Sequence, residues 1–315
     1  MNTPIKIGVS ACLLGERVRY DGGHTQDRYI TDTLGTYFTF VPVCPEAGCG
    51  LPIPREAMRL EGDPAAPRLM TRQTRVDKTD QMLAFCAEKV TELEGEDLCG
   101  FIFKKNSPSS GLFRVKVYNN GQAKKDGSGL FAAAIVRRFP LLPVEEEGRL
   151  NDAAIRENFI ERIFSYRRWK DFLAVSPTVG RLVVFHSAHK LLMMAHSPQL
   201  YREMGGLVAH AAELKLCNVL CRYEELFMKA LALHATVKKN TNVLQHIMGY
   251  FKQQLTTEEK AELLEIIVQY HDGLLPLVVP VTLLRHYINK YNQQYLKEQV
   301  YLAPHPAQLM LRNHV

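Results

Sequence analysis

The chain has 315 residues, of which 46% are hydrophobic and 23% are charged, and its formal net charge is +6. This composition is typical of a soluble globular protein long enough for two domains, and no apolar run reaches the roughly 18–20 residues of a membrane helix. Seven cysteines are too sparse for a secreted disulfide scaffold, so we expect reduced thiols or metal ligands, a cytoplasmic location and no membrane partner.

The first half alternates strand-like apolar runs with loops and helical stretches. Helical spacing covers residues 77–93 and 129–139, and the strand candidates are Ile5–Ser10, Phe38–Val43, Leu98–Phe103 and Leu141–Val144. Strand–loop–helix alternation predicts a Rossmann-like α/β domain with a mostly parallel sheet. Its working loops are expected at the carboxyl ends of the strands.

The second half has helical periodicity and few strand signals. Ser197-Pro198 and the segment Thr256–Glu259 are typical of helix starts, with a capping residue followed by proline or acidic residues. We therefore predict an all-α C-terminal domain. The join is expected near residues 145–158, which gives domains of 1–155 and 156–315.

The net positive charge of the chain comes entirely from its second half. Residues 1–158 carry 21 Lys+Arg and 21 Asp+Glu, whereas residues 159–315 carry 18 and 12. A basic excess in one half is consistent with a polyanionic partner such as RNA, but on charge alone a mildly basic helical surface is the favoured interpretation.

Two segments of the second half are candidates for RNA binding. The stretch SYRRWKDF mixes basic and aromatic side chains, which can contact phosphates and stack on bases; its candidates are Arg167, Arg168, Trp169 and Lys170. Lys238 and Lys239 form a second basic pair. The alternative for SYRRWKDF is an amphipathic helix whose aromatic side chains lie in the core.

Three loops of the first half carry groups that could act together. They hold Cys12; then Cys44, Glu46 and Cys49; then Ser107, Ser109 and Ser110. Thiolates from separate loops can bind zinc or an iron–sulfur cluster. The spacing is not diagnostic, so buried inert cysteines remain the alternative. Elsewhere, Cys86, Cys99, Cys217 and Cys221 are expected in the core.

Long motifs in both halves resemble known families. The segments GVSACLLGERVRYDGGH, CPEAGCGLPIPRE and FKKNSPSSGLFRVKVY resemble the thiouracil desulfidase (TudS) family. The segments RLVVFHSAHKLLMMAHS, NVLQHIMGYF and YLAPHPAQLMLRN are similar to the helical domain typified by YbgA. The fused arrangement resembles the tRNA 4-thiouridine desulfidases (RudS).

The resemblance implies a [4Fe–4S] cluster held by three cysteines, with one iron open to the sulfur of the substrate. Cys12 and Cys44 match the first two cysteines, and Ser110 stands where the family has the third. A hydroxyl binds iron less well than a thiolate. Three interpretations remain open: an engineered replacement of cysteine, participation of Cys49 as an alternate ligand, which we favour, or weak cluster binding.

The resemblance also assigns catalytic roles. Glu46 is expected to act as a general base on water, Ser107 to donate a proton or hold the pyrimidine, and Lys104 to stabilise negative charge. Without the resemblance, Glu46 would be a helix-start acid and Ser107 a cap or turn residue.

The sequence therefore predicts an iron–sulfur-dependent hydrolase that converts 4-thiouridine in tRNA to uridine and releases sulfide. One alternative is a desulfidase of free thiopyrimidines or thionucleosides. The other is a non-catalytic RNA-binding protein without a cluster, an alternative that Ser110 keeps open.

Overall fold

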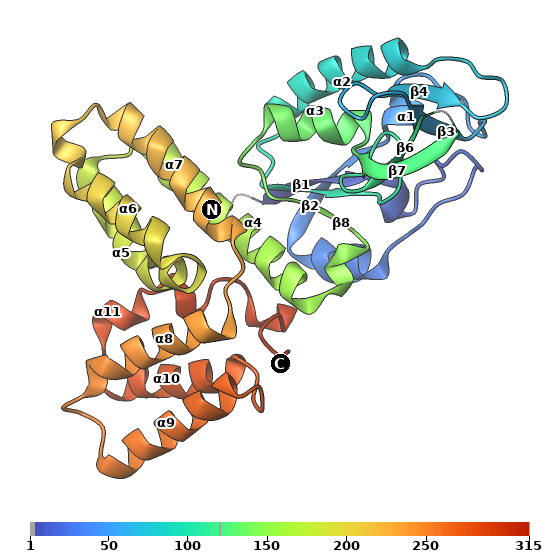
Figure 1. Cartoon of the computed structure of the whole chain (residues 1–315). Coiled ribbons are helices and arrows are strands. Elements are labelled where there is room, and N and C mark those ends of the chain that lie inside the picture. Colours follow the sequence, from blue (N-terminus) through green and yellow to red (C-terminus); the bar gives the residue numbers. More distant parts are fainter. Residues whose placement is uncertain (1–3, 120, 315) are drawn as a thin grey trace. The chain divides into compact units, whose positions relative to one another are not determined.

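The computed structural model describes residues 4–119 and 121–314. The chain divides into two compact units, Met1–Asn151 and Asp152–Val315, which we call the α/β unit and the helical unit (Figure 1).

A four-stranded parallel sheet forms the centre of the α/β unit. Its strand order is β2-β1-β5-β8, with β1 Ile5–Ser10, β2 Phe38–Val43, β5 Gly100–Phe103 and β8 Val144–Glu146. The central strands carry near-continuous apolar runs because both faces of such a sheet are covered. All four strands point the same way, so the loops that follow them meet at one edge.

The helices of this unit confirm the predicted helical stretches. Helix α2 spans Thr79–Glu94 and α3 spans Leu130–Arg138, and the two helices pack against each other (Figure 1). A short helix α1, Pro45–Gly48, follows β2 directly. The last strand begins later than predicted: residues 141–143 form a turn and the strand starts at Val144. Pro143 explains the shift, because proline has no N–H to donate to a strand neighbour.

A second sheet was not predicted as such. It has the order β4-β3-β6-β7, with β3 Met58–Glu61, β4 Arg68–Thr71, β6 Val115–Asn119 and β7 Gln122–Gly127. Strand β7 has the sequence QAKKDG, which lacks any apolar alternation. Only its antiparallel pairing with β6 makes it a strand, so propensity alone could not identify it.

The helical unit confirms the predicted all-α domain. Its longer helices are α4 Ala153–Ala174, α5 Val179–His196, α6 Pro198–Ala209, α7 Leu216–Ala232, α8 Val237–Met248, α9 Thr257–His271 and α10 Val278–Lys290, followed by a short α11 Gln294–Lys297. Both predicted helix starts are present. Ser197 accepts a hydrogen bond from the N–H of Leu200, and Thr256 forms a capping box with Glu259.

Two cysteines expected in the core of the helical unit are exposed. Cys217 and Cys221 are four residues apart on α7 and lie on its solvent face, whereas Val219 and Tyr223 are buried. The prediction was wrong because α7 is amphipathic and the spacing of four residues places both thiols on the outer face. Cys86 and Cys99 are buried, as predicted. No helix in the described ranges is long and apolar enough to cross a membrane.

Candidate active site

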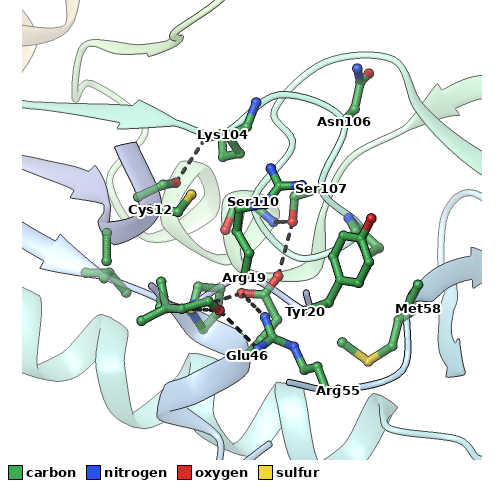
Figure 2. Close-up of a pocket in the computed structure, with 18 of the residues that line it drawn as sticks. Cys12, Arg19, Tyr20, Glu46, Arg55, Met58, Lys104, Asn106, Ser107 and Ser110 are labelled. Carbon is green, nitrogen blue, oxygen red and sulfur yellow. Dashed lines mark hydrogen bonds and ion pairs between the residues drawn. The ribbon is translucent and has the colours of Figure 1, made fainter. Parts of the chain in front are cut away.

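The loops after the parallel strands enclose a pocket of about 410 Å³. Figure 2 shows side chains from the loops after β1, β2 and β5 turned toward it. Ser10, at the end of β1, ties two of these loops together, because its hydroxyl accepts a hydrogen bond from the backbone N–H of Lys104 (2.9 Å). The residues that line the pocket include Cys12, Arg19, Tyr20, Cys44, Glu46, Arg55, Lys104, Asn106, Ser107 and Ser110.

The structure brings the thiols of Cys12 and Cys44 to the same pocket, although the two residues are 32 positions apart in the sequence. Both thiols are largely buried. Burial, together with the nearby Glu46 carboxylate, raises the pKa of Cys44 to about 12. Burial also raises the pKa of Cys12, which the hydrogen bond of Thr25 and the charge of Lys104 act to lower. Positive charge or a metal is therefore needed to bring either thiol to its thiolate form at neutral pH.

Ser110 faces this pocket and Cys49 does not. The Ser110 side chain lines the cavity with Cys12 and Cys44, and its backbone N–H donates to Ser107 Oγ (3.0 Å). Cys49 follows α1, and its thiol turns back to donate to the backbone oxygen of Glu46 (3.3 Å). The pocket that Cys12 and Cys44 line is therefore lined by Ser110 and not by Cys49, and participation of Cys49 as a ligand stays a prediction.

Glu46 is the centre of the hydrogen bonds in the pocket. One carboxylate oxygen accepts from the hydroxyls of Ser109 and Ser107 (3.3 Å for Ser107), and the other accepts from the Cys44 thiol (3.4 Å). Arg55 lies 3.9 Å from the same carboxylate and donates to the backbone oxygen of Val18 (3.0 Å). Arg55 thus braces a loop carboxylate, and its buried Nε has no hydrogen-bond partner in the described part of the chain.

Ser107 both shapes its loop and faces Glu46. Its hydroxyl oxygen accepts from the backbone N–H groups of Ser109 (3.2 Å) and Ser110 (3.0 Å). That is the turn role that serine has without any functional assignment. Its proton is directed to Glu46, so the predicted proton relay also has the required geometry. Ser109 was named in this loop by the sequence analysis but was given no role of its own; its contact with Glu46 now adds it to the site.

The serine loop is held against the start of α3. The carbonyl of Ser109 accepts from the N–H groups of Phe131 (2.9 Å) and Ala132 (3.2 Å), which satisfies free donors of the first helical turn. The approach is so close that a Cβ at Gly129 would lie 2.4 Å from the Ser109 oxygen. Glycine at this position therefore lets the loop lie where Ser107 and Ser110 reach the pocket.

Lys104 is paired inside the α/β unit. Its ammonium contacts the buried carboxylate of Glu147, which also accepts from the backbone N–H of Lys105 (2.8 Å). Glu147 follows β8 and was not predicted as a site residue; its place after a parallel strand was the only available signal. The Lys104 charge still reaches Cys12, whose pKa it lowers.

Most of the predicted RNA-binding residues of the helical unit are buried or make contacts within the protein. Trp169 is 0% exposed and stacks on Tyr223, with ring centroids 5.3 Å apart, so the prediction that it binds bases was wrong. Arg167 is buried and pairs with Asp171 (2.8 Å), and Arg168 donates to the Pro304 carbonyl. These two arginines are therefore unsuited to phosphate contact, because the helix buries the face that carries them.

The other lysines of that prediction differ in exposure. Lys170 lies over the Tyr166 ring at 4.9 Å. Lys239 donates to the carbonyls of His196 (2.7 Å) and His234 (3.2 Å), which stabilises the end of α5. Lys238 is exposed. No group of three or more His, Cys, Asp or Glu side chains within residues 4–119 and 121–314 is placed to hold a metal ion.

Comparisons with known proteins divide along the same two units. Residues 7–147 match the family model of 2-thiouracil desulfurase, and residues 190–306 match that of a protein of unknown function, DUF1722. The uncharacterized protein YbgA of Escherichia coli (strain K12) is 31% identical over 153 residues, which cover 48% of this chain and 90% of YbgA. The solved structure of the [4Fe-4S]-dependent thiouracil desulfidase TudS is 30% identical, with coverage of 47% of this chain and 94% of that chain and a TM-score of 0.39.

The chain therefore belongs to the family of YbgA, and it carries a 2-thiouracil desulfurase domain in its first unit and a DUF1722 domain in its second. The predicted fusion of these two domains is confirmed.

Proposed function

We propose that the chain is a desulfidase that converts 4-thiouridine in tRNA to uridine and releases sulfide. The observation that carries the proposal is the meeting of Cys12, Cys44 and Glu46 in one pocket of a domain that matches the 2-thiouracil desulfurase family. Nucleophilic replacement of a thiocarbonyl sulfur needs a soft acceptor for sulfur and a base for water, and this pocket offers donors for the first and a carboxylate for the second.

The cofactor of the proposed reaction is a [4Fe–4S] cluster, the cofactor named for the similar TudS structure. Cys12 and Cys44 would hold it through thiolates, with the Ser110 hydroxyl as the third donor. The residues fit this group in two respects: the thiols converge from separate loops on one cavity, and Arg55 presents an unpartnered buried N–H beside it. When bound, the cluster supplies a Lewis-acidic iron that accepts the sulfur of the substrate.

Glu46 acts in this proposal as the general base. Deprotonation of Cys44 removes the hydrogen bond from its thiol to Glu46, and that carboxylate oxygen becomes available to a water molecule. Ser107 and Ser109 meanwhile hold the other oxygen and fix the plane of the carboxylate. The net reaction exchanges a C=S bond for a C=O bond, consumes one water and releases one hydrogen sulfide, so no external oxidant or reductant is required.

The RNA substrate is supported by the net charge of +6 and by the second domain, since a single-nucleoside substrate does not require either. The family description favours a second candidate, the desulfuration of free 2-thiouracil. Anaerobic reconstitution, followed by sulfide measurement with thiolated tRNA, free 4-thiouridine and free 2-thiouracil, separates the two. Sulfide release from tRNA at the highest kcat/KM is expected, and release only from free bases would contradict the tRNA proposal.

The role of Ser110 is tested by the exchange Ser110→Cys. A third thiolate binds iron more strongly than a hydroxyl, so the variant is expected to retain more iron and sulfide per chain after exposure to a chelator. Cys49→Ala serves as the matched control and is expected to leave the metal content unchanged. Loss of iron in Cys49→Ala would show that the thiol outside the pocket participates after all.

A further inference from the structure

A second groove of the α/β unit lies beside the candidate active site. It has a volume of about 770 Å³, and its lining includes residues of strands β3, β6 and β7 of the second sheet. The two cavities are adjacent, because both are lined by Met58, Arg72, Lys105, Asn106 and Pro108. We call this second cavity the basic groove. Its unpaired cations are Arg72, Lys105, Arg114, Lys116 and Lys125.

The lining of the basic groove is strongly positive. Seven lysine and arginine side chains line it, against the single carboxylate of Glu146. That carboxylate is buried and accepts from the backbone N–H groups of Leu112 (2.8 Å) and Phe113 (3.1 Å), so it holds the loop in place. Two of the seven cations, Arg59 and Arg149, are paired with carboxylates of Glu61 and Glu145. The other five form no ion pair with any carboxylate in the described ranges, and all five are exposed.

The sheet places two of these cations directly opposite each other. Lys116 of β6 pairs in register with Lys125 of β7, and like charges at opposed positions destabilise an antiparallel pair. Lys124, by contrast, pairs with Val117, whose side chain is buried on the other face. An opposed lysine pair with no counter-charge among the described carboxylates is the arrangement expected where the neutralising charge comes from a ligand.

Two aromatic rings lie among the cations. Phe113 is 41% exposed and lies under the Arg149 guanidinium at 5.0 Å, and Arg59 lies over the Tyr118 ring at 4.6 Å. Cations that meet phosphates beside rings that can stack on bases are typical of surfaces that bind an unpaired nucleic acid strand. A free phosphate would use neither the length of the groove nor the rings.

We infer that the basic groove binds the ribose-phosphate backbone of the RNA strand that flanks the nucleoside in the active site. The inference rests on the proposed function for the identity of that nucleoside. It moves the main RNA contact from the helical unit, where the net charge suggested it, to the second sheet of the α/β unit. The shared lining places the groove next to the pocket that holds Cys12 and Glu46, so a strand in the groove lies beside the nucleoside in the pocket.

The test is a pair of charge reversals on one strand of the full-length protein. Lys125→Glu places a carboxylate in the basic groove, and Lys124→Glu makes the same change on the adjacent residue outside it. Binding of a fluorescein-labelled, unmodified tRNA transcript is measured by anisotropy over a range of salt concentrations. Thermal unfolding of both variants checks that the β6–β7 hairpin is intact.

We expect Lys125→Glu to weaken tRNA binding by on the order of tenfold and to lower the slope of log affinity against log salt by about 1, with Lys124→Glu close to the parent protein. Equal affinities of the two variants would overturn the inference. A second outcome would also overturn the inference: the parent protein binds no tRNA but binds phosphatidylserine vesicles, and Lys125→Glu weakens that vesicle binding.

The binding assay needs neither cluster nor turnover, so it separates the two proposals. If no sulfide is released from any substrate but Lys125→Glu still loses tRNA affinity, the basic groove stands and the desulfidase proposal fails. If thiolated tRNA is turned over with an unchanged kcat/KM in Lys125→Glu, the desulfidase proposal stands and the basic groove is not the RNA site.

Discussion

The two units use their charged and aromatic side chains in opposite ways. In the helical unit, buried ionic groups satisfy one another: Glu161 accepts from His196 and Arg312, and Arg312 also contacts Glu157. In the α/β unit, cations of the basic groove and the thiols of the pocket face open volume. Groups that are mutually satisfied stabilise a fold, whereas groups left facing a cavity are available to a ligand.

The imidazole of His196 illustrates the first arrangement. Its Nδ1 contacts the carbonyl of Leu233 and its Nε2 contacts the Glu161 carboxylate, and both partners are acceptors. The buried ring of His196 is therefore held between two acceptors from different segments of the helical unit. Burial acts to raise the pKa of Glu161, but the charges of His196 and Arg312 hold it well below its usual range. This network lines a cavity of about 360 Å³, yet its charges are already paired within the protein.

The comparison predicts that changes in the pocket lower activity and changes in the helical core lower stability. The largest effect is expected from Cys44→Ala, which removes one of two thiolate donors and should abolish cluster binding and sulfide release. Iron content after anaerobic reconstitution measures it. Cys217→Ala, at an exposed thiol of the helical unit, is the matched control and should retain full iron content. Iron retained by Cys44→Ala would place the cluster elsewhere.

Trp169→Ala tests whether the buried side chains of the helical unit serve stability. The ring is fully buried among Phe172, Phe185 and Tyr223, so its loss leaves a large cavity. The free energy of unfolding of the helical unit is expected to fall by about 3–5 kcal/mol, measured by urea denaturation. Lys170→Ala, next along the helix, should change it by less than about 1 kcal/mol. A stable Trp169→Ala protein that has lost only tRNA affinity would restore the stacking role that burial excludes.

Glu46→Gln sharpens the role of the pocket. The amide keeps an acceptor for Ser107 and Ser109 but is a far weaker base, so kcat for desulfuration should fall by roughly 10²–10⁴ while KM changes little. Single-turnover measurement of sulfide release tests this. Iron content must remain at the parent level, because a parallel loss of iron would assign Glu46 to cluster binding instead of proton transfer.

Acid should weaken the helical unit through His189. Burial lowers the pKa of His189 to about 3, well below the value of about 6.5 in an unfolded chain. Between these values the unfolded state binds the extra proton, so stability falls as pH falls from about 6.5 toward 3. The urea midpoint at pH 7.5 and 5.5 should therefore differ less in His189→Leu than in the parent. An identical difference in both proteins would assign the acid sensitivity to other groups.

The smallest effect is expected at Lys238, the one residue classed as exposed among the basic residues first predicted to bind RNA. Lys238→Glu should leave the affinity for unmodified tRNA within about twofold, since a single solvated charge contributes little. If Lys238→Glu lost as much tRNA affinity as is expected for Lys125→Glu, the main RNA contact would lie in the helical unit, and the contrast drawn between the two units would be wrong.

Much of the site could be predicted from the sequence, because the apolar runs show where the strands end and therefore which loops follow them. The apolar runs that became β1, β2 and β5 placed Cys12, Cys44 and Ser107 on loops at one sheet edge. The absence of Cys49 from the pocket lining could not be predicted, because spacing in the chain does not reveal which way a thiol points after a helical turn. The contact of Ser109 with Glu46 and the place of Glu147 in the site were missed, because serine and glutamate are common in loops and only their contacts distinguish them.

By itself, the sequence determined the two-domain division, the α/β and all-α classes and the loops that carry the thiols, because hydrophobic periodicity and strand–loop–helix order are local properties. Only the tertiary structure decided that Ser110 and not Cys49 lines the pocket, that Trp169 is core, and that the cations without ion pairs gather in one groove of the α/β unit. Those outcomes depend on contacts between side chains that are far apart in the sequence, and such contacts cannot be predicted from composition or from spacing along the chain.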